Sequence, residues 1–334
     1  MEFHDVIVVG GGPGGGACAA RLRQHGMDCL VLDRASFPRL KLCAGWITPE
    51  VVADLDMNPN DYPGSFLTFP RLQIHFPWLS TRLNTTQHSI RRVEFDHWLL
   101  ERSGAPVREH YVRKIRREGE HYVLDETYRC RYLVGAAGTK CPVYRELFRG
   151  ANPRARELQA VTLEEEFAYQ WEDPACHLWF FEQGLPGYAW YVPKANGHLN
   201  IGIGGMAHRL KCRGDDIKRH WTHFIDVLRE RGLVRNHAFE PGGYSYYLRD
   251  GVQTLRVDNA FIVGDSVGLA TRDLCEGIGP AIRTGQHAAD AIATGSDYTL
   301  DTVNAFSNTA WPVKKALEYM FVGRKEKEKA QAAA

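Results

Sequence analysis

The architecture follows from one stretch near the N-terminus, Asp5-Val6-Ile7-Val8-Val9-Gly10-Gly11-Gly12-Pro13-Gly14-Gly15-Gly16. Its apolar first part is typical of a parallel strand that is buried on both faces. Small residues then lead into a predicted helix from about Ala17 to His25, and Cys29-Leu30-Val31-Leu32-Asp33 is a second apolar strand. Strand, turn, helix and strand in this order predict a βαβ unit at the start of the chain.

The turn has the spacing Gly10-x-Gly12-x-x-Gly15, which suits a dinucleotide. Glycines at these places permit the tight turn, the approach of a pyrophosphate to the backbone and the packing of helix on strand. The helix behind the turn offers free amides and a partial positive charge to phosphates. Asp33 ends the second strand, where a carboxylate accepts hydrogen bonds from ribose hydroxyls. An acid there disfavours a 2′-phosphate, so FAD or NAD fits better than NADP.

A second candidate element lies near the other end of the chain. A short apolar strand runs from Asn259 to Asp265, and Glu276-Gly277-Ile278-Gly279-Pro280 precedes a predicted helix from Pro280 to Thr294. Val263-Gly264-Asp265 resembles the second flavin signature of the glutathione-reductase-like and p-hydroxybenzoate-hydroxylase-like flavoproteins, in which the Asp binds the ribityl chain of FAD. The N-terminus of the following helix would stabilise negative charge on a reduced flavin.

Taken together, these motifs resemble the geranylgeranyl reductase family of FAD-dependent oxidoreductases, within the p-hydroxybenzoate hydroxylase-like superfamily. The resemblance extends from Val6 to about Ile292. Besides the glycine turn, the matching segments are Lys41-Leu42-Cys43-Ala44-Gly45, Arg92-Val93-Glu94-Phe95-Asp96, Tyr132-Leu133-Val134-Gly135-Ala136-Ala137-Gly138, Tyr188-Ala189-Trp190-Tyr191-Val192-Pro193 and Gly264-Asp265 through Gly279.

The resemblance implies a set of residues that hold FAD without a covalent bond. It places Arg92 near the FAD, and Cys43 and Ala44 beside the flavin ring. The predicted cofactor-binding residues are Gly10, Gly12, Pro13, Gly14, Gly15, Asp33, Arg34, Cys43, Ala44, Arg92, Val112, Gly138, Asp265, Gly277 and Ile278. The candidate catalytic residues are Cys43, Tyr188 and Trp190, and no metal site is predicted.

The residues themselves leave several roles open. Cys43 is either a small buried residue or a reactive thiol. Tyr188 and Trp190 alternate along a strand and face one side of a sheet, as core packing or as a pocket wall. Arg272, near the flavin motif, is either a ligand for an anionic substrate or a solvated side chain.

By family analogy, the predicted function is reduction of carbon–carbon double bonds in an apolar, isoprenoid-type substrate by hydride transfer from reduced flavin. NADH, NADPH or another reductant, including an electron-donor protein, would reduce the flavin. The alternatives are a flavin-dependent monooxygenase or halogenase and a non-catalytic electron-relay flavoprotein. Ala137-Gly138 stands where aromatic hydroxylases carry Asp-Gly, which disfavours an NADPH-driven hydroxylase.

The predicted fold class is α/β, with a Rossmann-like FAD domain interleaved with a smaller antiparallel β-sheet domain that binds substrate. The FAD domain is assigned to residues 1–70, 91–155 and 256–300, and the substrate domain to 71–90 and 156–255. Residues 301–334 are predicted to form a helical tail. Further helices are expected at Arg91–Glu101 and about Asp215–Arg231, and irregular structure with short strands at Phe37–Ile90.

Composition limits the partners. The chain has 334 residues and a net charge of +1, which gives no reason to expect a nucleic acid. Its eight cysteines form no CxxC pair, as in proteins with reduced cytosolic thiols. The start of the chain shows no secretory signal and no stretch is long enough to span a bilayer, so a cytoplasmic location is expected. Peripheral contact with a membrane, for example through the basic and apolar tail, stays open.

Overall fold

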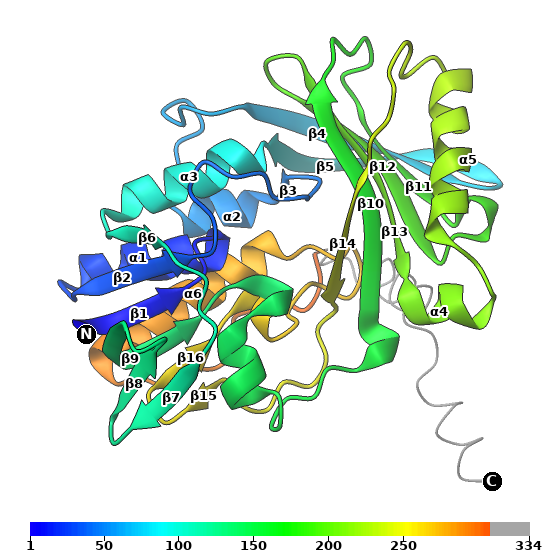
Figure 1. Cartoon of the computed structure of the whole chain (residues 1–334). Helices are drawn as coiled ribbons and strands as arrows, with labels where there is room; N and C mark the ends of the chain where they lie inside the picture. Colours follow the sequence, from blue (N-terminus) through cyan, green and yellow to red (C-terminus); the bar gives the residue numbers. More distant parts are fainter. Residues whose placement is uncertain (308–334) are drawn as a thin grey trace, which may run out of the picture.

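Two mixed β-sheets form the framework of the molecule (Figure 1). The structure is a computed structural model, and it describes residues 1–307. Each sheet of this part has eight strands. The helical tail predicted from residue 301 lies outside the described residues from 308 onward; residues 301–307 form turns and bends.

The first sheet contains the predicted βαβ unit. Its main path has the order β15-β16-β9-β1-β2-β6, in which β1, β2, β6, β9 and β16 run parallel. The strands are β1 Glu2–Val9, β2 Cys29–Asp33, β6 Val107–Glu109, β7 Ile115–Glu118, β8 His121–Leu124, β9 Tyr128–Gly135, β15 Arg256–Val257 and β16 Ala260–Ile262. The β7–β8 pair joins the sheet through β9.

Three helices cover one face of this sheet: α1 Pro13–Gln24, α3 Arg92–Ser103 and α6 Ile278–Thr294. The helix α1 lies between the other two, in close contact with both. It begins at Pro13, four residues before the predicted start, with Gly12 as its N-cap. Its first glycines allow this packing, because a Cβ on Gly14 would lie 3.0 Å from the Ala281 carbonyl oxygen on α6. The predicted α/β class with a Rossmann-like unit is confirmed.

The second sheet has the order β14-β10-β13-β12-β11-β4-β5-β3. Its pairs are antiparallel except for β11 with β4. Its strands are β3 Trp46–Ile47, β4 Phe66–Phe76, β5 Leu79–Ile90, β10 Gln159–Ala168, β11 Cys176–Phe180, β12 Gly187–Lys194, β13 His198–Met206 and β14 Gly242–Tyr247. The amphipathic helix α5, Ile217–Glu230, packs on one face, where Trp221, Phe224 and Leu228 join one apolar cluster with Trp179 and Ile201. The opposite face is therefore free to line a site.

One expectation from the sequence is wrong. The segment Phe37–Ile90 contains a long hairpin, with 11 residues in β4 and 12 in β5, and not only short strands. Its prolines do not interrupt pairing: Pro70 lies where the β4–β5 register shifts, and Pro77 lies in the turn. Proline is tolerated at such bulges and turns, so it does not exclude a strand. The segment also contains the short helix α2, Pro49–Asp54.

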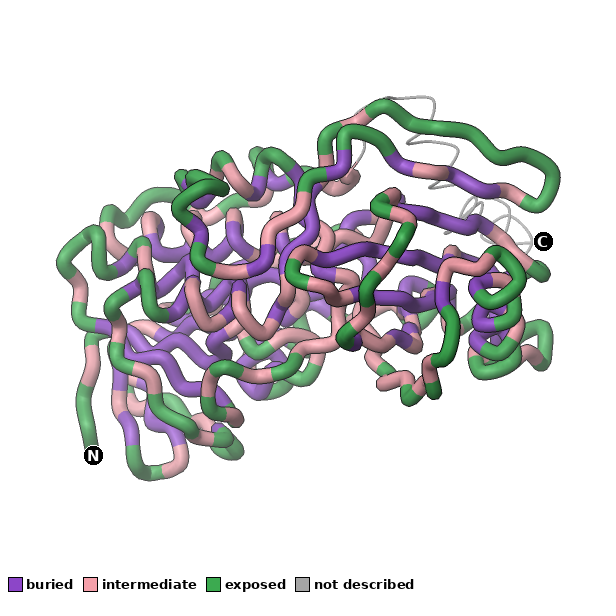
Figure 2. The backbone as a smooth tube through the Cα atoms, turned by 90° about the horizontal axis from the view of Figure 1, so that it is seen from above, coloured by how far each residue is buried: buried purple, intermediate pink, exposed green. Residues whose placement is uncertain are grey.

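The other expected helices are present as α3, α5 and α6, and α4 spans Ala207–Cys212. The chain passes repeatedly between the sheets: β3 to β5 belong to the second, β6 to β9 to the first, and β10 to β14 to the second again. The exact domain boundaries stay a prediction; β4, for example, starts before residue 71. Figure 2 shows buried backbone along the strands of both sheets. Within residues 1–307 no helix is both long and apolar enough to cross a bilayer.

Candidate active site

A cavity of about 970 Å³ is lined by residues of both sheets. All but one of the predicted site residues line it: Gly10, Gly12, Pro13, Gly14, Asp33, Arg34, Cys43, Ala44, Arg92, Val112, Gly138, Tyr188, Trp190, Asp265, Gly277 and Ile278. The exception is Gly15, which lies beneath the turn. Segments that are distant in the sequence therefore meet around one space, and the role of each residue in it remains a prediction.

The glycine turn closes one end of the cavity. Gly10 has a φ of +111°, and a Cβ there would lie 2.5 Å from the carbonyl carbon of Ala136. A Cβ on Gly15 would lie 1.8 Å from the Gly10 carbonyl oxygen. Gly12 caps α1 without any side-chain hydrogen bond, which leaves the first amides of the helix for a ligand. Such an end binds phosphate.

Asp33 is held in a fixed position beside this turn. Its Oδ2 accepts a hydrogen bond of 2.7 Å from the Gly11 amide, and its Oδ1 accepts one of 3.1 Å from the Ala35 amide. Arg39 lies 3.5 Å from the same carboxylate. The remaining acceptor capacity of Asp33 is available to a hydroxyl-bearing ligand in the cavity.

A second binding element lies across the cavity at the end of β16. Asp265 is half-buried, and its buried Oδ1 has no hydrogen-bond partner among the described residues. Burial raises the pKa of this carboxyl, while Lys41, Arg92 and Arg154 oppose the rise. Gly277 caps α6 without a side-chain hydrogen bond, and a Cβ on it would lie 3.0 Å from Asp265 Oδ1. An unpaired carboxyl oxygen beside the positive end of a helix dipole fits the hydroxyls and ring of a flavin nucleotide.

Between these two elements lies the loop that carries Cys43. Arg92 is buried and forms a two-point ion pair with Asp96, at 2.7 and 2.8 Å, and it also hydrogen-bonds the Cys43 thiol. On the other side, Lys194 Nζ donates hydrogen bonds to the carbonyl oxygens of Ala44 and Ile90. Burial lowers the pKa of Lys194 to about 8. The loop is thus clamped by two buried cations.

The free face of the second sheet makes the opposite wall. Residues paired across strands share a face, so two rows can be read from the register. One row is Tyr244, Thr162, Gly204 and Tyr188, and the other is Gly242, Glu164, Gly202 and Trp190. A Cβ on Gly202 would lie 2.2 Å from the Trp190 ring. Gly202 therefore makes room for the Trp190 ring, which lines the cavity.

The two aromatic candidates on this wall are held by hydrogen bonds. Trp190 Nε1 donates to Asn200 Oδ1 at 2.7 Å, and the Tyr188 hydroxyl donates to the Leu274 carbonyl oxygen at 2.6 Å. Burial raises the pKa of Tyr188 well above its ordinary value. Because both side chains line the cavity, they form a pocket wall and not only core.

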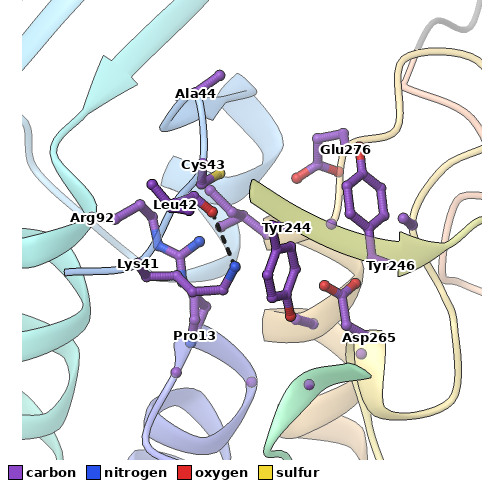
Figure 3. A pocket seen from close by; sticks show the side chains of 18 of the residues that line it. Pro13, Lys41, Leu42, Cys43, Ala44, Arg92, Tyr244, Tyr246, Asp265 and Glu276 are labelled. Carbon is purple, nitrogen blue, oxygen red and sulfur yellow. Dashed lines mark hydrogen bonds between the residues drawn. The ribbon is translucent and has the colours of Figure 1, made fainter. Parts of the chain in front are cut away.

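Several cavity residues were missed from the sequence. Figure 3 shows Lys41, Tyr244, Tyr246 and Glu276 around the same space as Arg92 and Asp265. The Lys41 ammonium lies 3.3 Å from the centre of the Tyr244 ring and donates to the Leu42 carbonyl oxygen. Glu164 also lines the cavity. The alternation of side chains along a strand, which puts Thr162 and Glu164 on one face, could have indicated Glu164 from the sequence.

Two of these missed residues are carboxyls with unusual acidity. Burial raises the pKa of Glu164 to about 7, partly opposed by Lys41, Lys194 and Arg92. Burial likewise raises the pKa of Glu276 to about 7, partly opposed by the Gly279 amide, which donates to its Oε1 at 2.6 Å. Glu164 Oε2 has no hydrogen-bond partner in the described part of the chain. Carboxyls of this kind exchange protons near neutral pH.

Comparison with known proteins agrees with this geometry. Residues 8–58 match the NAD(P)-binding Rossmann-like domain family. The chain is 28% identical to menaquinone reductase of Mycolicibacterium smegmatis, over 92% of this chain and 79% of the relative. It is 24% identical to digeranylgeranylglycerophospholipid reductase 2 of Methanosphaera stadtmanae, over 92% and 82%. The predicted relationship to the geranylgeranyl reductases is confirmed.

Solved structures share the fold. A geranylgeranyl bacteriochlorophyll reductase-like protein from Thermoplasma acidophilum superposes with a TM-score of 0.77 and 19% identity, over 96% of this chain and 84% of that one. The flavin-dependent brominase Bmp2 gives a TM-score of 0.67 and 18% identity, over 89% and 81%. The prediction of an oxidoreductase is also confirmed, because the relatives over most of the chain are named reductases. No group of three His, Cys, Asp or Glu side chains within residues 1–307 is arranged to hold a metal.

Proposed function

We propose that the protein is an FAD-dependent reductase that saturates carbon–carbon double bonds in an apolar isoprenoid substrate. The observation that carries this proposal is the continuity of the cavity. It joins a phosphate-binding turn and an unpaired Asp265 to a wall of Tyr188, Trp190 and Leu274. The relatives named above are reductases of menaquinone and of a digeranylgeranyl lipid, and both compounds carry isoprenoid chains.

FAD fits the two binding elements better than a nicotinamide dinucleotide does. The turn at Gly10–Gly15 and Asp33 would bind the pyrophosphate and the adenosine ribose. Asp265 and the N-terminal end of α6 would bind the ribityl chain and the flavin ring, a second anchor that an NAD site does not need. Cys43, next to Arg92, would border both the ring and the substrate. NADH, NADPH or another reductant would reduce the flavin.

The chain itself would supply the proton. When bound in its reduced form, the flavin supplies a hydride to one carbon of the double bond. Glu164 donates a proton to the other carbon, so the double bond gains two hydrogens, and solvent then restores the proton on Glu164. Its pKa of about 7 and its unpaired Oε2 support this role. Tyr188 and Trp190 are better suited to hold the substrate, because their N–H and O–H groups already donate to Asn200 and Leu274.

The proposal is tested by anaerobic single turnover. Protein that has been loaded with FAD and reduced with dithionite is mixed with a prenylated quinone or a geranylgeranyl lipid. The flavin should be reoxidised without oxygen, with one equivalent of product that carries two additional hydrogens. The Asp265→Ala variant, which should lose FAD, is the control for the binding site. Product that forms only with oxygen would support a monooxygenase or halogenase instead, and full FAD occupancy with no turnover would support an electron-relay protein.

A further inference from the structure

The turn of the β4–β5 hairpin exposes large apolar side chains. Trp78 is 76% exposed, Leu79 is 54% exposed and Leu83 on β5 is 37% exposed. Figure 1 shows that the hairpin extends to the end of the molecule away from the first sheet. Aromatic side chains with a polar edge favour the boundary between water and lipid. An exposed apolar turn of this kind suits contact with a membrane surface.

An apolar face connects this turn with the cavity. Successive rings lie close together in the order Tyr188, Phe180, Phe76 and Trp78, with centroid separations of 5.4, 5.5 and 5.9 Å. The series begins at the cavity wall, where Tyr188 is, and ends at the exposed Trp78. In the middle of the hairpin, the paired residues Leu72 and Leu83 also line the cavity. The cavity therefore reaches the middle of the hairpin, on the face from which the aromatic series continues to the turn.

The charge of the hairpin suits an anionic surface. Residues 66–90 contain no Asp or Glu, although these residues are about as frequent as Lys and Arg in the whole chain. Arg71 and Arg82 in this segment are both exposed. Basic side chains beside an apolar turn add attraction to anionic lipid headgroups.

We infer that the tip of the hairpin, Phe76–Leu79, inserts at the headgroup level of an anionic lipid bilayer. The apolar side of the hairpin, where Leu72 and Leu83 line the cavity, then guides an isoprenoid chain from the lipid toward the cavity. This part of the inference rests on the proposed function, because an apolar path to the cavity is needed only if the substrate is an isoprenoid chain. Binding of the tip to lipid does not depend on catalysis and can be measured separately.

The test uses the full-length protein with bound flavin and measures sedimentation with lipid vesicles. Vesicles of phosphatidylcholine with about one-third phosphatidylglycerol should bind the protein, and the double variant Trp78→Ser, Leu79→Ser should lower the affinity on the order of tenfold. Arg71→Gln with Arg82→Gln should lower it about fivefold for each arginine at low salt, and much less at high salt.

The matched control is Phe3→Ser, since Phe3 is 51% exposed on β1 and does not line the cavity. This variant should bind vesicles as the original protein does. Flavin content and the thermal midpoint show whether each variant is folded. Folded Trp78→Ser, Leu79→Ser protein that binds vesicles with unchanged affinity would overturn the inference, as would equal loss in Phe3→Ser. Because no turnover is measured, failure of the reductase proposal leaves this result unaffected.

Discussion

Replacing Glu164 by glutamine tests the proposed proton donor while the shape of the cavity wall is kept. The Glu164 side chain is buried on β10, with a residue exposure of 2%, and its pKa is raised from 4.5 to about 7. At pH 7 a carboxyl with the ordinary pKa would be protonated in about 0.3% of molecules, whereas a pKa of about 7 leaves about half protonated. At pH 7, burial thus raises the protonated fraction of Glu164 more than a hundredfold.

The glutamine variant keeps the shape of the side chain but has no acidic proton to give. In anaerobic single turnover with pre-reduced FAD, the rate of substrate reduction should fall by roughly 10² to 10⁴, the usual contribution of a general acid. For the original protein, the rate should be constant below pH 6 and fall about tenfold per pH unit above pH 8, as the acid form is lost. The variant should lack this dependence.

Glu276→Gln is the matched control, because Glu276 also lines the cavity and burial of its carboxyl likewise raises its pKa to about 7. Its Oε1 accepts from the Gly279 amide at the start of α6, so the carboxyl is engaged by the backbone. Its substitution should affect flavin binding more than the pH profile. If Glu164→Gln retains its rate within about threefold with an unchanged profile, the assignment of the proton donor is refuted. If Glu276→Gln shows the loss instead, the donor is the other carboxyl.

The raised pKa of Glu164 can also be tested by a stability measurement that needs no turnover. Because the folded-state pKa of Glu164 lies above the unfolded value, the folded protein binds this proton more tightly. The resulting stability is fully present below pH 4.5 and is lost as the pH rises through 7. Between pH 5.5 and 8.0, this single group should lower the free energy of unfolding by about 2 kcal/mol. Chemical unfolding should therefore show a pH dependence that is about 2 kcal/mol smaller in Glu164→Gln.

Two further substitutions test the frame around the cavity. Gly15→Ala, whose Cβ would lie 1.8 Å from the Gly10 carbonyl oxygen, should lose flavin on gel filtration and unfold at lower temperature, whereas Gly150→Ala, with no atom within 4 Å, should do neither. Normal flavin content in Gly15→Ala would contradict the tight turn. Lys194→Met removes a buried donor to two carbonyl oxygens and should lower the free energy of unfolding by about 2–4 kcal/mol in urea, whereas the exposed Lys211→Met should change it by less than about 0.5 kcal/mol. Equal stability of the two lysine variants would show that the clamp on the loop is not needed for folding.

The cofactor end of the molecule could be predicted from the sequence because its signals are local. The strand, the glycine turn and Asp33 lie within about 30 residues of one another. Their geometry depends mainly on backbone that glycine alone can adopt, as at Gly10 with its φ of +111°. Asp265 was found because Val263-Gly264-Asp265 directly follows a short apolar strand and resembles a known flavin signature. In these segments, the residues that determine the geometry of the predicted cofactor site are close together in the sequence.

The substrate end could not be predicted in the same way. The run Glu164-Glu165-Glu166 is typical of a solvated strand edge, yet Glu164 is buried. Its burial comes from pairing with β13 and β14, which follow it by more than 30 residues. The hairpin at Phe66–Ile90 was missed because prolines normally argue against a strand, and only the register shows that they lie at a bulge and a turn.

The glycines beside Glu164 explain why its carboxyl is surrounded by apolar side chains of the cavity wall. Gly202 lies opposite Glu164 on β13 and Gly242 lies opposite it on β14. Neither can offer a polar side chain, and the space above them is filled by apolar groups: a Cβ on Gly202 would lie 2.2 Å from the Trp190 ring, and one on Gly242 would lie 2.6 Å from Leu42. The carboxyl is therefore enclosed by an indole ring and a leucine, which penalise its charged form. A residue larger than glycine at either position would displace Trp190 or Leu42, so it would change both the shape of the cavity wall and the pKa of the proposed donor.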